Sequence, residues 1–242
     1  MLEIRHKNMS DTRATQQAYN EIYSNEGIQL RDSFYLWLIS LLHPQPGKNL
    51  IDISCGQGRL TALAQQQGIY AVGIDFAIDG VERGQRLSPE SGWAVGDGEG
   101  LPIKDMTADY ITHIGSLEHY QHPHSGAREI ARILKPDGKA CILVPNAFGL
   151  LGNIRHVWTT GDIFDDGQPL QRYGTPGFWQ TMFSNSGLKV DKTLGWNEIE
   201  FPRTARDAIF LFKHPQKIIR FALSPIIPVN LTNHLVFICS RA

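Results

Sequence analysis

The fold is decided by residues 50–61, which read Leu-Ile-Asp-Ile-Ser-Cys-Gly-Gln-Gly-Arg-Leu-Thr. A short apolar strand that contains Asp52 leads into a Ser-Cys-Gly-x-Gly turn, and the turn opens directly into a helix. Gly56 and Gly58 allow the backbone to turn tightly and leave no Cβ between it and a ligand. The stretch therefore predicts a nucleotide-type pocket at the carboxyl end of the first strand of a doubly wound sheet.

Strand-like and helix-like segments alternate from residue 49 to residue 145. Apolar runs predict the strands, and amphipathic patterns between them predict the helices. This alternation favours a parallel sheet with helices on both faces. The predicted strands are 49–53, 70–75, 92–96, 108–114 and 139–145, and the predicted helices are 58–67, 78–86 and 123–134.

The segments outside this unit are less regular. Residues 1–47 predict a helical cap with amphipathic helices at 11–25 and 29–43, and residues 146–173 predict a lid loop without regular structure. After this loop we expect a helix at 175–186, a strand at 188–195, one basic helical segment at 203–222 and a strand at 234–240.

Composition narrows the function classes. The chain has 242 residues and a formal net charge of -1, so no global basic field exists to attract nucleic acid. The three cysteines, Cys55, Cys141 and Cys239, are far apart and odd in number, which argues against a disulfide framework and suits a reducing compartment. Neither a signal-peptide core nor an apolar run of about 18 residues is seen. We expect a cytoplasmic protein.

Acidic residues follow the second and third predicted strands. Asp75 ends the second strand, where a carboxylate can accept both hydroxyl hydrogens of a ribose. Its alternative role is to cap helix 78–86. Asp97 lies in a Gly-Asp-Gly sequence and can accept from the exocyclic amine of adenine, or it can serve only as a turn residue. Phe76 and Leu101 are candidates to sandwich the base.

The acids also bear on which nucleotide is bound. A dinucleotide fingerprint needs a third glycine, and Thr61 stands in its place. Pyrophosphate favours a helix N-terminus without nearby carboxylates, whereas Asp52 and Glu118 are expected near this turn. A ligand with a positive amine and a sulfonium suits such a site better than one with two phosphates.

With these residues in place, the sequence resembles the class I S-adenosylmethionine-dependent methyltransferases. It is most similar to the broad branch that includes ubiquinone-type, small-molecule and glycan methyltransferases. The resemblance runs from about residue 48 to residue 196. The matching stretches are 52–58, Asp75, Asp97 with Gly98, 109–119 and 134–139.

This resemblance implies a Rossmann-like, doubly wound α/β fold. Its seven-stranded sheet has an antiparallel last strand, and residues 48–242 form the methyltransferase domain, with 146–173 and 203–222 as insertions. It also implies S-adenosylmethionine as the cofactor. The implied cofactor-binding residues are Asp52, Ser54, Gly56, Gly58, Asp75, Phe76, Asp97, Gly98 and Ser116.

Catalytic candidates follow the fourth strand, where the methyl group would point. His119 is the first choice for a general base because its usual pKa is near neutral, and Glu118 and Tyr120 are its neighbours. His119 could instead only contact the cofactor or cap the next helix. Some relatives hold a divalent cation here with Glu-x-x-Glu-His, but Gly115 replaces the first glutamate. We therefore expect no metal, and we interpret His122 and His124 as surface residues.

The predicted function is methyl transfer to a small-molecule or glycan acceptor, by O- or N-methylation. Alternatives are a nucleic-acid or protein methyltransferase, a non-catalytic cofactor-binding module, and a dehydrogenase. Candidate acceptor contacts are Arg155, His156, Trp158 and Tyr173. Residues 203–220 mix basic and apolar side chains and predict either weak membrane-surface contact or an ordinary packed helix. A monomer or homodimer is expected.

Overall fold

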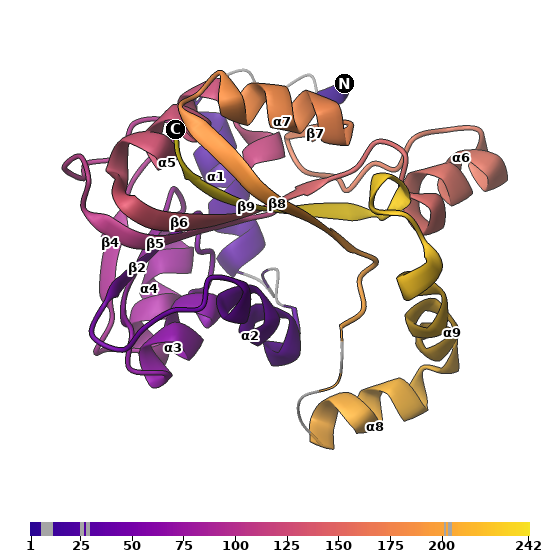
Figure 1. The fold of residues 1–242 in the computed structure, drawn as a ribbon, viewed down its shortest axis with the longest axis horizontal. Coiled ribbons are helices and arrows are strands. Elements are labelled where there is room, and N and C mark those ends of the chain that lie inside the picture. Colours follow the sequence, from indigo (N-terminus) through magenta and orange to yellow (C-terminus); the bar gives the residue numbers. More distant parts are fainter. Residues whose placement is uncertain (6–11, 25–26, 28–29, 201, 203–204) are drawn as a thin grey trace.

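A seven-stranded mixed sheet forms the centre of the molecule (Figure 1). The computed structural model describes residues 1–5, 12–24, 27, 30–200, 202 and 205–242. The strand order is β4-β3-β2-β5-β6-β9-β8, and β9 runs antiparallel to both neighbours, whereas the pairs from β4 to β6 are parallel. The predicted α/β Rossmann-like fold with an antiparallel last strand is confirmed. The strands are β2 (Asn49–Ile53), β3 (Tyr70–Asp75), β4 (Gly92–Val95), β5 (Ala108–Ile114), β6 (Leu134–Pro145), β8 (Leu188–Trp196) and β9 (His234–Arg241).

Helices cover both faces of this sheet. Successive strand residues point to opposite faces, and both faces are buried. Leu235 and Phe237 of β9 thus join the core cluster that includes Trp179 and Phe183 of α7, whereas Val236 joins the cluster that includes Phe34 of α2. The helices are α1 (Thr12–Ser24), α2 (Asp32–Leu41), α3 (Arg59–Gln66), α4 (Ile78–Leu87), α5 (Pro123–Ile133) and α7 (Pro176–Ser184). None of the described helices is long and apolar enough to cross a membrane.

Residues 146–173 are more regular than predicted. They contain a π-helical turn η2 (Leu150–Ile154), helix α6 (Arg155–Thr160) and strand β7 (Leu170–Tyr173). Strand β7 pairs antiparallel with β1 (Leu2–Arg5), and Arg5 lies opposite Leu170. The prediction of a structureless loop was wrong, because the partner strand lies far away in the sequence and local periodicity carries no trace of that pairing.

The basic segment 203–222 forms two helices rather than one. Helix α8 (Ala205–Lys213) and helix α9 (Pro215–Leu223) are separated at His214, whose φ of -127° and ψ of 72° are not helical. Pro215 disfavours helical geometry in the preceding residue and has no N–H to donate to the earlier turn. The prediction of one continuous helix was therefore wrong. Arg203 lies outside the described residues. Short turns η3 (Ser224–Ile226) and η4 (Val229–Leu231) connect α9 to β9.

The glycine turn shows why small residues are needed beside β4. Gly58 has φ of 71°, and a Cβ at this position would lie 2.1 Å from Cη2 of Trp93. Gly84 of α4 packs against the same indole ring. Gly58 therefore lets α3 and α4 approach Trp93, which is a packing role.

The Gly58→Ala substitution should destabilise the protein by on the order of 3 kcal/mol, because it adds a steric clash to a left-handed backbone. The free energy of unfolding from urea denaturation measures this loss. Gly100→Ala is the matched control, since a Cβ there meets no described atom within 4 Å. Equal unfolding midpoints for the two variants would contradict this packing role.

Candidate functional site

A cavity of about 370 Å³ opens at the carboxyl ends of β2, β3 and β5. The chain leaves β2 towards β3 and β4 on one side of the sheet, and returns to β5 and β6 on the other. Such a reversal separates the loops after neighbouring strands and creates a crevice for a ligand. The cavity therefore lies where the glycine turn predicted a pocket.

Asp75 holds the glycine turn against the end of β3. Its carboxylate accepts hydrogen bonds from the backbone N–H groups of Gly56 at 2.7 Å and Ala77 at 2.8 Å. The helix-cap alternative is not observed, because the side chain of Asp75 binds N–H groups that precede α4. A carboxylate has about four acceptor positions. Asp75 lines the cavity and keeps acceptor capacity for a ligand, and burial raises its pKa to about 6.

Asp52 is a second buried acid at the cavity. Its two carboxylate oxygens accept from the hydroxyl groups of Thr112 at 2.7 Å and Thr61 at 2.9 Å. Burial raises the pKa of the Asp52 carboxyl to about 7. Thr61, which replaces the third glycine of a dinucleotide fingerprint, thus orients the acid that precedes the turn.

The turn after β4 forms the next part of the wall. Asp97 lines the cavity and also accepts from the backbone N–H of Glu99 at 2.9 Å, so it occupies the turn role while keeping a place in the cavity wall. A Cβ at Gly98 would lie 1.8 Å from the hydroxyl oxygen of Tyr120. That hydroxyl lies 2.8 Å from Oγ of Ser54, which joins the turns after β4, β5 and β2.

The remaining predicted cofactor residues divide into two groups. Phe76, Gly56 and Ser116 line the cavity. Gly58 is not among the lining residues described and packs against Trp93. Leu101, proposed to sandwich a base with Phe76, belongs to the buried core instead.

Three tyrosines from the N-terminal helices complete the wall. Tyr19, Tyr23 and Tyr35 line the cavity, and burial raises the pKa of each. The hydroxyl of Tyr19 donates to Oε1 of Gln168 at 3.2 Å, so α1 meets segment 146–173 above the cavity. Sequence reasoning missed these residues. The four-residue spacing of Tyr19 and Tyr23 could have indicated one shared helix face.

His119 lies in the wall with a defined proton arrangement. Its Nδ1 donates to the carbonyl oxygen of Leu170 at 2.5 Å, so in the neutral ring Nε2 is the acceptor. Nε2 lies 3.9 Å from Oε1 of Glu118 and 3.9 Å from Oδ2 of Asp166. Burial lowers the pKa of His119, and the Arg172 charge acts in the same direction. The helix-cap alternative for His119 is not observed, because His122 occupies the cap of α5.

Glu118 is more deeply placed than its neighbour. It is buried and is not among the described residues that line the cavity, and its Oε2 atom has no hydrogen-bond partner within the described part of the chain. Burial raises the pKa of Glu118 to about 8, and Asp166 adds to the shift. Its place is therefore behind His119.

Arg172 holds this loop in position. It is buried and donates to the carbonyl oxygens of Glu118, Tyr120 and Gln121. Its Nε also pairs with Oε2 of Glu3 at 2.7 Å. The small β1–β7 sheet thus supports the loop that carries His119. This support was not predicted, because Arg172 was assigned to a structureless loop.

The predicted acceptor contacts lie elsewhere. None of them belongs to the described cavity wall, where Gln168 represents segment 146–173. Trp158 is 87% exposed, and the Tyr173 hydroxyl donates to the carbonyl oxygen of Phe164 at 2.8 Å. His122 does line the cavity. In the described ranges, no three His, Cys, Asp or Glu residues are grouped so that they could hold a metal ion.

Known sequences and structures are similar to this chain. Residues 51–142 match the family described as a methyltransferase domain. The demethylmenaquinone methyltransferase of Corynebacterium kroppenstedtii is 34% identical over 101 residues, which cover 42% of this chain and 43% of that protein. The chain spans about half the length of the curated relatives it matches, at 43% and 55% for two of them.

Solved structures extend the likeness to the whole fold. The [4+2]-cyclase SpnF superposes with a TM-score of 0.67 at 16% identity, covering 95% of this chain and 96% of that one. Phosphoethanolamine N-methyltransferase 2 of Haemonchus contortus, in complex with phosphomonomethylethanolamine and S-adenosylhomocysteine, has a TM-score of 0.63 at 15% identity, covering 95% and 58%. At these identities the likeness shows the fold alone.

The strand order and the cavity at its reversal define a methyltransferase-type α/β domain. The family match over residues 51–142 shows that this part of the chain is similar to a methyltransferase domain. The lining of the cavity suits S-adenosylmethionine, because Asp52, Asp75 and Asp97 present carboxylates to a ligand with a positive amine and a sulfonium.

The raised pKa of Glu118 makes the stability of the cofactor-free protein depend on pH. The folded state keeps a proton on Glu118 until about pH 8, whereas its ordinary pKa is 4.5. Between these two pH values the folded state therefore binds one more proton than the unfolded state. The stabilisation of the folded state by this proton is lost as the pH rises through the folded-state pKa. From about pH 7.3 to about pH 8 the free energy of unfolding should fall by up to ~1.4 kcal/mol per pH unit, since in this range histidines are mostly neutral and cysteines mostly protonated in both states.

Urea denaturation across this pH range measures the slope. Glu118→Gln should reduce the slope to less than roughly half, because Glu118 contributes most of the proton difference in this range and Asp52, with a pKa of about 7, contributes less. Glu82→Gln is the control, since the Glu82 side chain is 57% exposed, and it should keep the wild-type slope. An unchanged slope in Glu118→Gln would show that Glu118 is ionised in the folded protein.

Proposed function

We propose that this protein transfers a methyl group from S-adenosylmethionine to a small-molecule acceptor. When bound, the cofactor supplies a methyl carbon that its sulfonium has already activated for displacement. The single observation that carries the proposal is a cavity in which three carboxylates, Asp52, Asp75 and Asp97, are followed by His119 with Nε2 unprotonated in its neutral form. The protein then has to hold the acceptor at attack distance and exclude water.

The cofactor roles follow the order of the strands. Asp75 accepts the ribose hydroxyl groups, and Asp97 accepts from the adenine amine beside Phe76. Asp52 is directed at the amino group of the methionine portion. The backbone and hydroxyl groups near this portion belong to Ser54, Gly56 and Ser116, and Gly98 lies beside Asp97. Gly58 acts through packing, since it positions the turn without lining the cavity.

His119 is proposed as the general base for an acceptor that must lose a proton. The proton passes from the acceptor hydroxyl to Nε2, because Nδ1 already carries the hydrogen donated to Leu170. The lowered pKa keeps the ring neutral at physiological pH, which is the form a base needs. Glu118 and Asp166, each 3.9 Å from Nε2, then face the protonated ring.

A small acceptor is favoured by the cover of the cavity. Tyr19 of α1 bonds Gln168 of segment 146–173, and Gln16 donates to the carbonyl oxygen of Phe76 at 2.8 Å. We propose that residues 1–47 form the cap expected from the sequence. The names of the relatives also refer to small acceptors. A glycan acceptor, a cytoplasmic location and a monomeric or homodimeric state are retained as proposals.

The alternatives predict different ligands. Because similar folds include a [4+2]-cyclase, fold alone does not establish methyl transfer. A dehydrogenase would bind a dinucleotide, whose pyrophosphate is disfavoured by the buried carboxylates at this turn. A nucleic-acid methyltransferase is disfavoured by the net charge of -1.

Calorimetric titration with S-adenosylmethionine should show saturable binding, and titration with NAD should not. Asp97→Ala and Asp75→Asn should each weaken binding roughly tenfold to a hundredfold, since a hydrogen bond to a charged group contributes about 1.5–3 kcal/mol. Asp97 is exposed, so its variant tests binding without endangering the fold. Asp137→Ala, at an exposed position of β6, is the control. Tight NAD binding without S-adenosylmethionine binding would overturn the proposal.

His119→Gln should lower kcat by about 10²–10⁴ with a hydroxyl acceptor while leaving cofactor affinity nearly unchanged. Transfer of radiolabelled methyl groups to a panel of phenols, sugars and amines identifies the acceptor, and rates across pH then test the base. The wild-type rate should fall on the acid side as His119 becomes protonated, and the variant should lose this dependence. If both proteins share one pH profile and one rate, His119 is not the base.

A further inference from the structure

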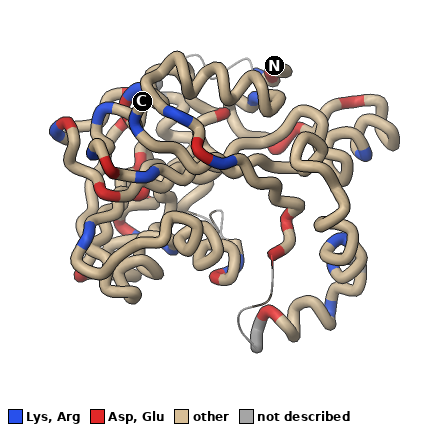
Figure 2. The backbone as a smooth tube through the Cα atoms, viewed as in Figure 1, with Lys and Arg blue, Asp and Glu red and all other residues tan. Residues whose placement is uncertain are grey.

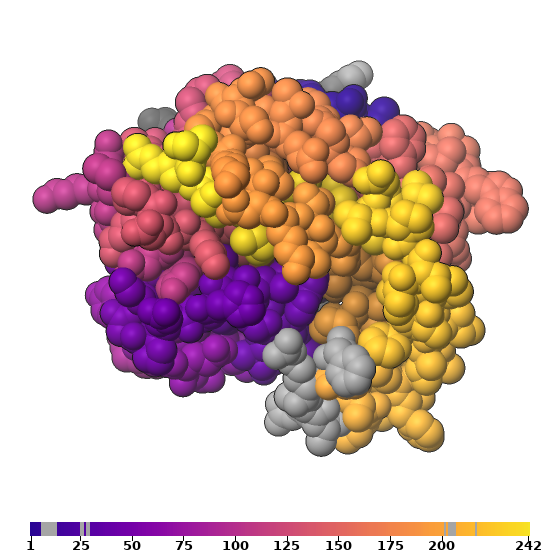
Figure 3. Space-filling model, in the orientation of Figure 1, coloured from indigo at the N-terminus to yellow at the C-terminus, as the bar shows by residue number. Residues whose placement is uncertain are grey.

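Large apolar side chains are exposed along one end of the molecule. Helices α6, α8 and α9 form this end, together with η3 (Figure 1). Figure 3 shows the α6 segment and the C-terminal residues adjoining on this side. A soluble monomer rarely leaves an extended apolar patch of this kind uncovered. The most exposed apolar residues here are Trp158 at 87%, Phe212 at 85%, Ile226 at 74%, Ile219 at 64%, Ile209 at 54% and Ile218 at 47%.

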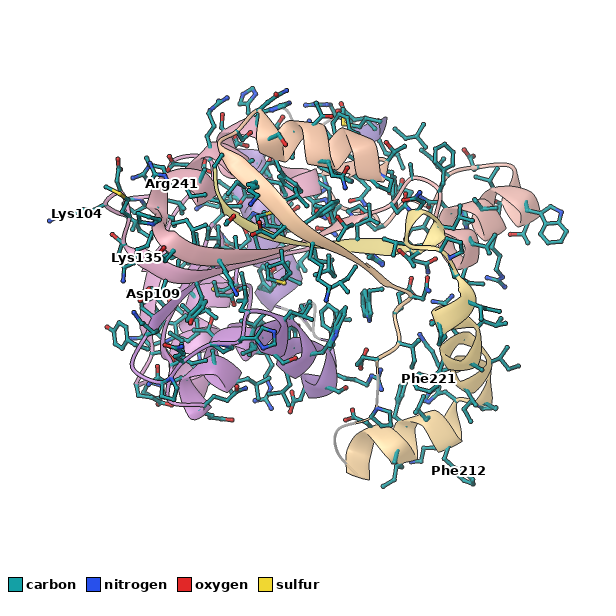
Figure 4. All side chains as sticks on the ribbon, in the orientation of Figure 1. Lys104, Asp109, Lys135, Phe212, Phe221 and Arg241 are labelled. Atoms are coloured by element: carbon teal, nitrogen blue, oxygen red, sulfur yellow. The ribbon has the colours of Figure 1, made fainter. Side chains whose placement is uncertain are left out.

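The two C-terminal helices are apolar on both sides. On the inner side, Phe210 lies under the guanidinium of Arg31, with 4.5 Å from the charge centre to the ring centroid. Figure 4 shows Phe221 on the inner side of α9 and Phe212 pointing away from the body. An ordinary surface helix has a polar outer face. The outer apolar residues are therefore not explained by packing within the chain.

The surface is also firmly attached to the body. Oε1 of Glu200 pairs with Arg31 and lies 2.7 Å from the Ser33 hydroxyl oxygen, which also lies 2.9 Å from Oδ1 of Asp207. The one hydrogen of this hydroxyl serves either carboxylate. These contacts fix the start of α8 on α2. At the other end, Arg220 of α9 pairs with Glu198 and donates to the carbonyl oxygen of Leu151 at 3.1 Å.

Charge is distributed unevenly around this patch. Residues 208–231 contain Lys213, Lys217 and Arg220 and no Asp or Glu, and of these Arg220 is paired with Glu198. Figure 2 shows basic positions on α9 and at the end of α8, with acidic positions on the connection from β8 and at the start of α8. Lys213 and Arg155 are exposed, and in the described structure neither forms an ion pair with a carboxylate. Apolar side chains are thus mixed with cations.

We propose that α6, α8, α9 and η3 form a docking surface for an anionic lipid bilayer. Apolar residues would enter the headgroup region and the cations would contact lipid phosphates, as in helices that lie in a membrane interface. Trp158 provides an indole of the kind enriched at membrane interfaces. A second copy of the chain fits the surface less well, because a symmetric contact would bring together two copies of the same positively charged surface.

This surface is distinct from the cavity and its test does not depend on methyl transfer. Trp158 lies in segment 146–173, which also contributes Gln168 to the cavity wall. Because one segment contributes to both, binding of S-adenosylmethionine is measured in parallel with binding of vesicles. A variant that loses only vesicle binding is then distinguished from one that also loses cofactor binding.

Sedimentation with phosphatidylglycerol vesicles tests the proposal. The full chain should bind these vesicles at low salt and bind phosphatidylcholine vesicles at least roughly tenfold more weakly, with binding reduced by added salt. Phe212→Ser combined with Ile219→Ser should reduce binding by roughly tenfold or more, since each buried apolar side chain contributes about 1.5–3 kcal/mol. Tyr70→Ser is the matched control, because Tyr70 is 58% exposed on β3, away from this surface.

Brominated lipids locate the contact directly. Tryptophan fluorescence of the wild-type protein should be quenched by them, and Trp158→Phe should lose most of that quenching. Unchanged unfolding midpoints show that the variants remain folded. Absence of binding to anionic vesicles at low salt would overturn the proposal. So would a dimer in analytical ultracentrifugation that Phe212→Ser with Ile219→Ser dissociates while vesicle binding is absent.

Discussion

The site depends on the carboxylate of Asp75, which accepts the backbone N–H groups of Gly56 and Ala77. These two bonds join the turn after β2 to the turn after β3. The left-handed φ of 54° at Gly56 directs its N–H group at the acid, and Tyr23 closes the space on the other side. A single buried acid thus organises two loops before any ligand arrives, which lowers the ordering cost of binding.

Buried acids also explain which ligands the cavity can accept. Burial raises the pKa of Asp52 to about 7 and of Asp75 to about 6, so their ionised forms are costly in the empty protein. A cation placed among them would recover part of that cost, and an anion would increase it. The buried acids therefore favour a positively charged ligand. The glycine turn alone gives no indication of the charge of the ligand.

The sheet could be predicted because strand periodicity and turn residues are local signals. The bounds of β2, β3 and β5 were predicted as 49–53, 70–75 and 108–114, and the structure agrees. Most of the cavity wall followed, since carboxyl ends of parallel strands meet at one edge. The part of the structure that covers the cavity, formed by α1 and segment 146–173, could not be predicted from the sequence. The bond between Tyr19 and Gln168 and the pairing of β1 with β7 join segments about 150 or more residues apart, and local patterns do not report such contacts.

The β1–β7 sheet contacts His119, the proposed base, through one hydrogen bond. The proton on Nδ1 of His119 is held by the carbonyl of Leu170, and Leu170 lies in β7 opposite Arg5 of β1. Glu3 of the same strand pairs with Arg172, which in turn binds the backbone on both sides of His119. The first strand of the chain therefore helps to set which nitrogen of His119 is free. A shift in β1–β7 pairing would move the Leu170 carbonyl away from Nδ1 of His119, while the seven-stranded sheet, which shares no strand with β1 and β7, would stay intact.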